Sequence, residues 1–205
     1  MFYRLVWPAN GKFATCGPYK PSYISTEHDN CPFCGSHIGG RYWEHPRTLA
    51  INGTRFPDFL FTTPYPAVSE RFVEMYKTSG LKGILGFDEI EHYRIRKTAT
   101  LNHKYYTLTV IRSKMSINYQ ESELEFGKNE HEHFCPLCDP QRRTLNGIKR
   151  LVLNEEGYDG EDIFKLYATG NALFLSERFV DFVKKNHLTN LGIRPLDDYE
   201  RRIVL

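Results

Sequence analysis

Two segments of the chain carry apolar residues at the spacing of an amphipathic helix. In each segment the apolar positions recur every three or four residues, and charged residues fill the positions between them. The stripes consist of Phe72, Val73 and Tyr76 in the first segment and of Phe179, Val180 and Val183 in the second. This spacing predicts two helices that each turn one apolar face toward the core.

Both predicted helices have start and stop signals. Ser69 and Ser176 precede the two segments, and a serine hydroxyl at this position accepts a hydrogen bond from a backbone N–H of the first turn. Gly80 is placed to end the first helix, because glycine readily adopts the left-handed conformation found at helix C-termini. Lys184 and Lys185 fall in the last turn of the second helix, where the carbonyl end of the helix dipole favours cations.

Several short segments favour β-strands, because they are rich in β-branched and aromatic residues and are bounded by Gly, Asn or Pro. They are Phe2–Trp7, Tyr93–Arg96, Tyr105–Arg112, Ile148–Leu153 and Ala172–Leu175. The segment Ser113–Glu132 is polar, and its pattern predicts a long exposed insertion or a hairpin. Helices mixed with many short strands predict an α+β fold.

The chain contains an internal repeat. Three landmarks occur twice in the same order, each second copy roughly 100 residues after the first, which indicates two homologous halves. The landmarks are Cys31–Cys34 with Cys135–Cys138, Asp58–Leu60 with Asp162–Phe164, and Ser69–Glu74 with Ser176–Asp181. We therefore expect residues 1–205 to form a single globular unit of two repeats, about 1–100 and 101–205, packed around a pseudo-two-fold axis.

Composition narrows the classes of function. A chain of 205 residues with 40% hydrophobic and 25% charged residues is able to bury a substantial core. A formal charge of +2 is too balanced to indicate binding to nucleic acid or to an anionic membrane through overall charge. No apolar run reaches the roughly 18 residues that a membrane helix needs, and the first residues lack the long apolar stretch of a signal peptide. We expect a cytoplasmic protein with no membrane partner.

Cysteine spacing indicates a metal site. Each Cys-Pro-x-Cys turn brings two thiolates to one side of a bend, which supplies half of the tetrahedral sulfur set that Zn²⁺ prefers in structural sites. If the two turns meet on the pseudo-two-fold axis, they close one site. We therefore expect one structural Zn²⁺, and its ligands would be Cys31, Cys34, Cys135 and Cys138. Two redox-active dithiols are the alternative, although the sequence lacks the βαβ context of a thioredoxin-type motif.

Neighbouring residues leave two further alternatives open. His37 follows the first cysteine pair, and His131 and His133 precede the second, so a site with a histidine ligand or a zinc-dependent hydrolase using His131 and His133 remains an alternative. The spacing fits neither the zincin nor the deaminase motif. The basic pairs Arg142–Arg143 and Lys149–Arg150 leave a zinc-ribbon-type nucleic-acid-binding protein open, although the adjoining glutamates oppose it.

No other chemical motif is recognisable. Phosphate-binding loops, dinucleotide fingerprints and serine nucleophile motifs are absent from the sequence. The remaining cysteine, Cys16, lies in a predicted turn without an identifiable base partner, so we expect a bystander thiol. The sequence therefore names no catalytic residue.

The repeated landmarks resemble those of the double-CXXCG motif proteins of myxobacteria and other bacteria. The resemblance rests on the two Cys-Pro-x-Cys turns, the two Ser-Glu-Arg-Phe-Val segments with their Leu/Gly/Ile tails, and the run Asp162–Tyr167. It spans nearly the whole chain, from Cys31 to about Leu196, but Asp139 replaces the glycine after the second turn. Members of that family are regarded as immunity proteins, so the resemblance implies a non-enzymatic protein that binds and neutralises a cognate bacterial toxin.

A glutamate-rich stretch is the candidate surface for such a partner. An acidic patch would steer association with a basic toxin and mimic phosphate, if the toxin is a nuclease. The residues are Glu121, Glu123, Glu125, Glu130 and Glu132.

Overall fold

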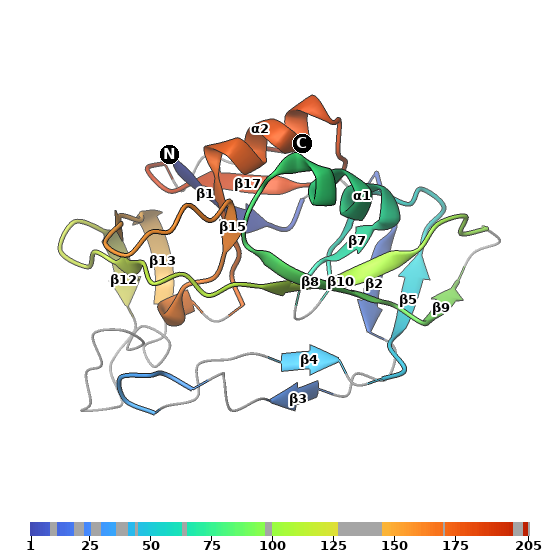
Figure 1. Ribbon diagram of the computed structural model, residues 1–205, viewed down its shortest axis with the longest axis horizontal. Coiled ribbons are helices and arrows are strands. Elements are labelled where there is room, and N and C mark those ends of the chain that lie inside the picture. The colour runs from blue at the N-terminus through green and yellow to red at the C-terminus, as the bar shows by residue number, and fades with distance from the viewer. Residues whose placement is uncertain are drawn as a thin grey trace.

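The computed structural model has the α+β architecture that the sequence predicts, with two α-helices among the residues it describes. The described residues are 1–8, 12–18, 23–25, 30–35, 41–43, 45–62, 65–96, 100–126, 145–169, 171–198 and 203–204. Within these ranges, neither helix is long and apolar enough to cross a membrane. The described chain forms an elongated body with the helices along one long side (Figure 1).

Both predicted helices form, as α1 (Glu70–Ser79) and α2 (Glu177–Lys185). Four of the five predicted strand segments form strands with ends shifted by up to two residues, whereas the segment Ile148–Leu153 is divided between the end of one strand and the start of the next. In chain order the strands are β1 (Phe2–Val6), β2 (Thr15–Pro18), β3 (Tyr23–Ser25), β4 (Arg41–Trp43), β5 (Thr48–Asn52), β6 (Phe59–Leu60), β7 (Ala67–Ser69), β8 (Ile84–Glu89), β9 (His92–Ile95), β10 (Tyr105–Val110), β11 (Ser116–Ile117), β12 (Glu123–Phe126), β13 (Leu145–Arg150), β14 (Leu153–Asn154), β15 (Ile163–Phe164), β16 (Phe174–Ser176), β17 (Gly192–Pro195) and β18 (Ile203–Val204).

Two sheets form the centre of the molecule, and their strands follow the same order. One sheet runs β6-β7-β10-β8, and the other runs β15-β16-β1-β17-β18. In each sheet the central strand, β10 or β1, is antiparallel to the strand before the helix and to the strand after it. The helices α1 and α2 each start directly after the strand next to the central one, β7 or β16, and lie side by side (Figure 1).

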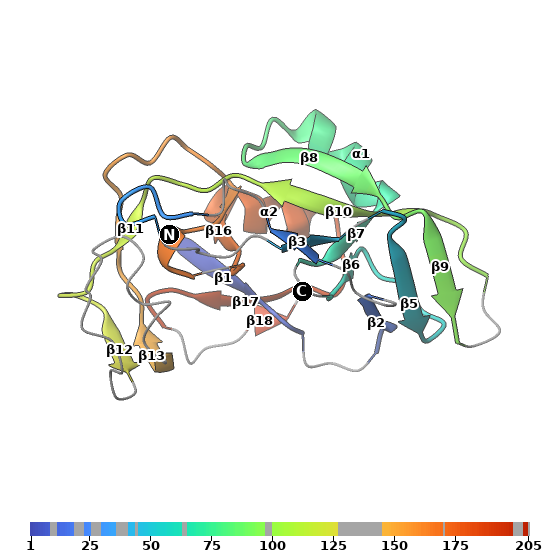
Figure 2. The same cartoon turned by 90° about the horizontal axis from the view of Figure 1, so that it is seen from below.

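The central strands reach across the sequence. β1 opens the chain but pairs with β16 and β17 near its end, and in Figure 2 the blue β1 lies beside the red β17. β10 follows β8 in the chain and pairs with β7 and β8. The N-terminal strand thus completes the C-terminal sheet, which joins the two ends of the chain in one structure.

The helix ends follow the predicted capping chemistry. Ser69 Oγ accepts the backbone N–H of Phe72, and Ser176 Oγ accepts the backbone N–H of Phe179, both at 3.2 Å. Gly80 ends α1 with φ of 71°, in the left-handed region where glycine is unstrained. These contacts satisfy N–H groups that the first helical turn leaves without intrahelical partners.

The two helices share one hydrophobic core. Phe72 and Phe179 are both fully buried, and their ring centroids lie 6.3 Å apart. Phe59 from β6 packs edge-on against Phe72 with ring centroids 4.9 Å apart. The predicted apolar stripes of both helices lie in this cluster, together with residues from both sheets. The core therefore spans both predicted repeats.

Smaller sheets lie around this centre. β2-β5-β9 forms at one end, and β12 pairs with β13 at the opposite end (Figure 1). The prediction for Ser113–Glu132 is partly wrong, because Ser113 and Met115 are fully buried and Ile117 is 8% exposed. Met115 and Ile117 fill a second hydrophobic cluster with Leu151, so this stretch packs against the fold before it enters the β12–β13 pair. The apolar residues of this stretch alternate with polar ones, so its sequence does not reveal that they are buried.

Candidate metal centre and binding surfaces

The first cysteine pair lies in a single tight turn. The backbone N–H of Gly35 donates to the carbonyl oxygen of Cys31 at 2.8 Å, and Gly35 has φ of 69°, in the left-handed region that favours glycine. Cys31 is buried and Cys34 is exposed. The turn therefore holds two cysteine thiols three positions apart in the chain.

The other predicted ligands lie outside the described residues. They are Cys135, Cys138, His37, His131 and His133. In the described ranges alone, no three His, Cys, Asp or Glu residues are grouped so that they could hold a metal ion. The four-cysteine site therefore stays a prediction.

A buried carboxylate organises the start of α1. Asp58 Oδ1 accepts a hydrogen bond from Ser69 Oγ at 2.8 Å. Its Oδ2 accepts the backbone N–H and the hydroxyl of Thr189, both at 2.9 Å, and Arg71 Nη1 lies 3.0 Å away. Because Thr189 follows α2, this carboxylate joins the beginning of one helix to the segment after the other.

A second buried carboxylate makes the corresponding contacts at α2. Asp162 Oδ1 accepts a hydrogen bond from Ser176 Oγ at 2.7 Å. Its Oδ2 accepts the backbone N–H of Lys82 at 3.0 Å, and Arg178 Nη1 lies 3.4 Å away. Lys82 follows α1, so the two aspartates connect the helices reciprocally. Asp58 and Asp162 were visible as repeated landmarks, but their partners after the helices were not.

The segments after the helices also approach the opposite sheet closely. Asn190, with φ of 68°, donates its side-chain amide to the carbonyl oxygen of Phe59 at 2.6 Å. Gly83, with φ of 119°, lies against Ile163, and a Cβ at this position would be 1.8 Å from the Ile163 carbonyl oxygen. Only glycine allows this approach. These contacts fix both connections in the central core.

The arginines of the two helices differ in exposure. Arg71 pairs with Asp58 and also donates to the carbonyl oxygen of Asn186, the residue that caps α2, at 2.6 Å. Arg178 pairs with Asp162, and its side chain is 63% exposed against 46% for Arg71. A large part of the Arg178 guanidinium therefore faces solvent while its position is tied to a buried carboxylate.

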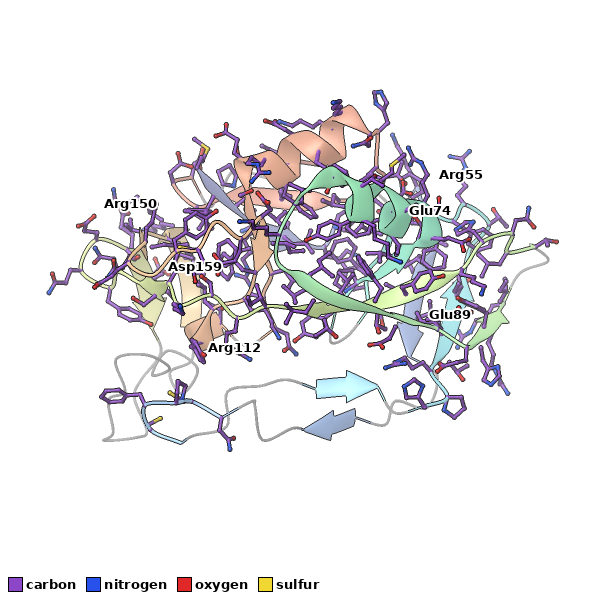
Figure 3. The ribbon with its side chains drawn as sticks, viewed as in Figure 1. Arg55, Glu74, Glu89, Arg112, Arg150 and Asp159 are labelled. Carbon is purple, nitrogen blue, oxygen red and sulfur yellow. The ribbon has the colours of Figure 1, made fainter. Side chains whose placement is uncertain are left out.

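The predicted acidic surface is partly described, and two of its carboxylates form ion pairs. Glu123 lies 3.5 Å from Arg150 Nε, and Glu125 lies 3.4 Å from Lys149 Nζ, across the β12–β13 pair. Arg150 also donates to the backbone carbonyl of Glu121 at 2.7 Å. Figure 3 shows Arg150 at this end of the molecule and Glu89 toward the other end. Glu130 and Glu132 lie outside the described residues.

Another charged cluster, not anticipated from sequence, joins β5 to the β8–β9 connection. Glu91 accepts hydrogen bonds from His45 and, at 2.6 Å, from the backbone N–H of Arg47. Partial burial acts to raise the pKa of Glu91, but hydrogen bonds from its own backbone, His45 and Arg47 outweigh it and lower the pKa. Arg47 is buried and lies 3.5 Å from Asp88. The residues are far apart in sequence, so no local motif indicates this structural cluster.

Cys16 has the environment of an inert thiol. Its Sγ donates to the carbonyl oxygen of Phe61 at 3.3 Å. Burial raises the pKa of the Cys16 thiol to about 12, because the thiolate loses its hydration inside the protein. The thiol therefore stays protonated at neutral pH, in line with the expected absence of nucleophilic chemistry at this residue.

Comparison with known proteins identifies one family. Residues 38–198, most of the chain, match the family described as "Immunity protein family (Imm11)". No curated protein has significant sequence similarity to the chain. The match begins after Cys31 and Cys34 but includes both helices, both buried aspartates and the second cysteine pair. The resemblance to the double-CXXCG proteins stays a prediction.

Proposed function

We propose that this chain, which belongs to the Imm11 immunity protein family, protects a cell by binding a cognate toxin in the cytoplasm and blocking its action. Family membership is the observation that carries this proposal, because an immunity role implies a toxin partner. A binding role needs a rigid scaffold and a complementary surface rather than a catalytic constellation. The reciprocal contacts of Asp58 and Asp162 support such a scaffold.

We further propose a structural Zn²⁺ held by Cys31, Cys34, Cys135 and Cys138. The described half fits this role, because Cys31 and Cys34 lie in one hydrogen-bonded turn that ends in a left-handed glycine. A bound ion would supply a cross-link between two distant segments and no reaction chemistry. The cysteines would hold the second turn against the first.

The same proposal includes an internal duplication around a pseudo-two-fold axis. Its support comes from contacts that recur in both parts of the chain: Asp58 and Asp162 bind the two N-cap serines, and the two sheets follow the same strand order. Under this proposal β1 and β10 are equivalent strands, each placed in the sheet of the other repeat. Such an exchange would make the two repeats inseparable.

Co-expression with the product of the adjacent gene tests the proposed function. A toxin encoded there should stop growth when expressed alone, and this chain should restore growth and co-purify with it. A matched control is a chain carrying Asp162→Ala, which removes a buried anchor and should lose protection together with its fold. Neither growth rescue nor a complex with the wild-type chain would contradict the proposal.

A further inference from the structure

An open groove lies between the two helices on the surface of the protein. Its volume is about 600 Å³, large enough to receive several side chains of a partner. The residues that line it come from the C-terminal half of α1, the turn after it and one face of α2: Met75, Thr78, Ser79, Leu81, Arg178, Asp181, Phe182, Lys185 and Asn186. The groove therefore follows the seam where the two helices meet.

The apolar part of the groove has a fixed shape. Met75, Leu81 and Phe182 are partly buried and pack against the central core, so each side chain is held from beneath. The Phe182 ring lies 6.2 Å from the ring of Phe179 and 6.3 Å from that of Phe72. An apolar side chain of a partner would find a preformed surface here, with little side-chain ordering left to reduce the affinity.

The rim of the groove is more basic than acidic. Two of the lining residues, Arg178 and Lys185, are basic and one, Asp181, is acidic, and all three are exposed. Asp162 anchors Arg178 at 3.4 Å, yet the Arg178 side chain stays 63% exposed. An arginine held in place by a buried carboxylate still has N–H groups available for a second carboxylate, and anchored arginines are frequent hot spots of interfaces.

We infer that this groove receives a segment of the toxin that carries an apolar side chain next to a carboxylate. The inference rests on the proposed function and specifies its binding surface and the chemistry of the partner. Charge complementarity favours an acidic segment, since the groove pairs an apolar floor with Arg178 and Lys185.

Two neighbouring lysines provide the central test. Lys185 lines the groove, whereas Lys184 is exposed in the same helical turn and does not line it. Both substitutions, Lys185→Glu and Lys184→Glu, replace a positive charge in the C-terminal turn of α2 with a negative one, so they change the interaction with the helix dipole by a similar amount. In a titration with the purified toxin, Lys185→Glu should weaken binding on the order of tenfold and Lys184→Glu by less than about twofold.

Substitution of Asp181 should change the affinity for the toxin in the opposite direction. Removing its charge by Asp181→Asn makes the groove more positive without altering the apolar floor. An acidic toxin segment should then bind about threefold more tightly, mainly through faster association at low salt. Weaker binding by Asp181→Asn, or equal effects of Lys184→Glu and Lys185→Glu, would overturn the inference.

The outcomes separate this inference from the proposed function. If the wild-type chain protects cells and Lys185→Glu protects them equally well at limiting expression, the groove is not the toxin site although the immunity role stands. If the wild-type chain gives neither a complex nor protection, the proposed function itself fails. If the chain alone forms a dimer that Lys185→Glu dissociates, the groove binds a second copy and the inference is wrong.

Discussion

At the scale of single residues, Asp58 and Asp162 connect segments that lie far apart in the chain. Each carboxylate is buried, and each joins an N-cap serine to the segment that follows the other helix. Removing a buried charge leaves its hydrogen-bond donors unpaired, which costs more than the loss of an exposed ion pair. The two aspartates therefore link the N-caps of both helices to the packing of the core.

Asp162→Asn should lower the free energy of unfolding by about 3 kcal/mol, because the amide cannot accept all the hydrogen bonds of the carboxylate. Asp159→Asn is the matched control in the same loop, since Asp159 is exposed and pairs with Lys114 at the surface. The control should change stability by less than about 0.5 kcal/mol. Urea unfolding measures both values, and equal effects would show that burial of Asp162 is not decisive.

Cys16 should resist alkylation in the native protein at about pH 8, because its pKa of about 12 leaves almost no thiolate and the residue is partly buried. Peptide mapping after treatment with iodoacetamide measures the modified fraction of Cys16. The same chain in urea is the control and should be modified fully. Rapid modification of Cys16 in the folded chain would contradict the inert assignment.

At the scale of elements, the two helices share aromatic contacts, in which Phe72 of α1 packs near Phe179 and Phe182 of α2. Phe72→Ala and Phe179→Ala should each lower stability by about 3 to 5 kcal/mol, because each removes a fully buried ring. Leu85→Ala is the control, since Leu85 is 67% exposed on β8 and should cost less than about 0.5 kcal/mol. Thermal unfolding compares the three variants. A small effect at either phenylalanine would mean that its helix is dispensable for the core.

The helices are predictable because their signals lie close together in the sequence, whereas the pairing of the strands is not predictable in this way. The helix caps depend on contacts within one or two turns of the capping residue, so the sequence pattern alone predicts the caps at Ser69, Gly80 and Ser176. The pairing of β1 with β16 and β17 joins opposite ends of the chain, and no local pattern encodes it. The reciprocal contacts of Asp58 and Asp162 depend on that packing and were missed for the same reason.

The groove between α1 and α2 also had no signature in the sequence. Arg178 and Lys185 appear there as ordinary polar positions of an amphipathic helix. Their placement above Met75 and Phe182 results from the packing of two helices that are far apart in the chain. The predicted glutamate surface stays a prediction, and its run of like residues in the sequence does not reveal the cross-strand cations that pair with Glu123 and Glu125.

At the scale of the whole molecule, the proposed zinc site would join the two predicted repeats in addition to the shared core. Cys135→Ser should lower both the zinc content and the melting temperature. The loss in free energy of unfolding should be smaller than the roughly 10 to 16 kcal/mol that zinc contributes in zinc-finger peptides, because the hydrophobic core also stabilises this fold. Cys16→Ser is the control and should keep its zinc. Elemental analysis of protein purified without chelators measures the metal. A wild-type chain without zinc would contradict the site.

Under the proposed function, the chain neutralises its toxin by binding rather than by catalysis. The most direct measurement titrates the purified chain into a fixed amount of the purified product of the adjacent gene while the residual toxin activity is recorded. A binding immunity protein predicts that inhibition increases in proportion to added chain and is complete once the two proteins are equimolar. Complete inactivation by a small fraction of an equivalent, or full toxin activity at an excess of chain, would contradict the claim.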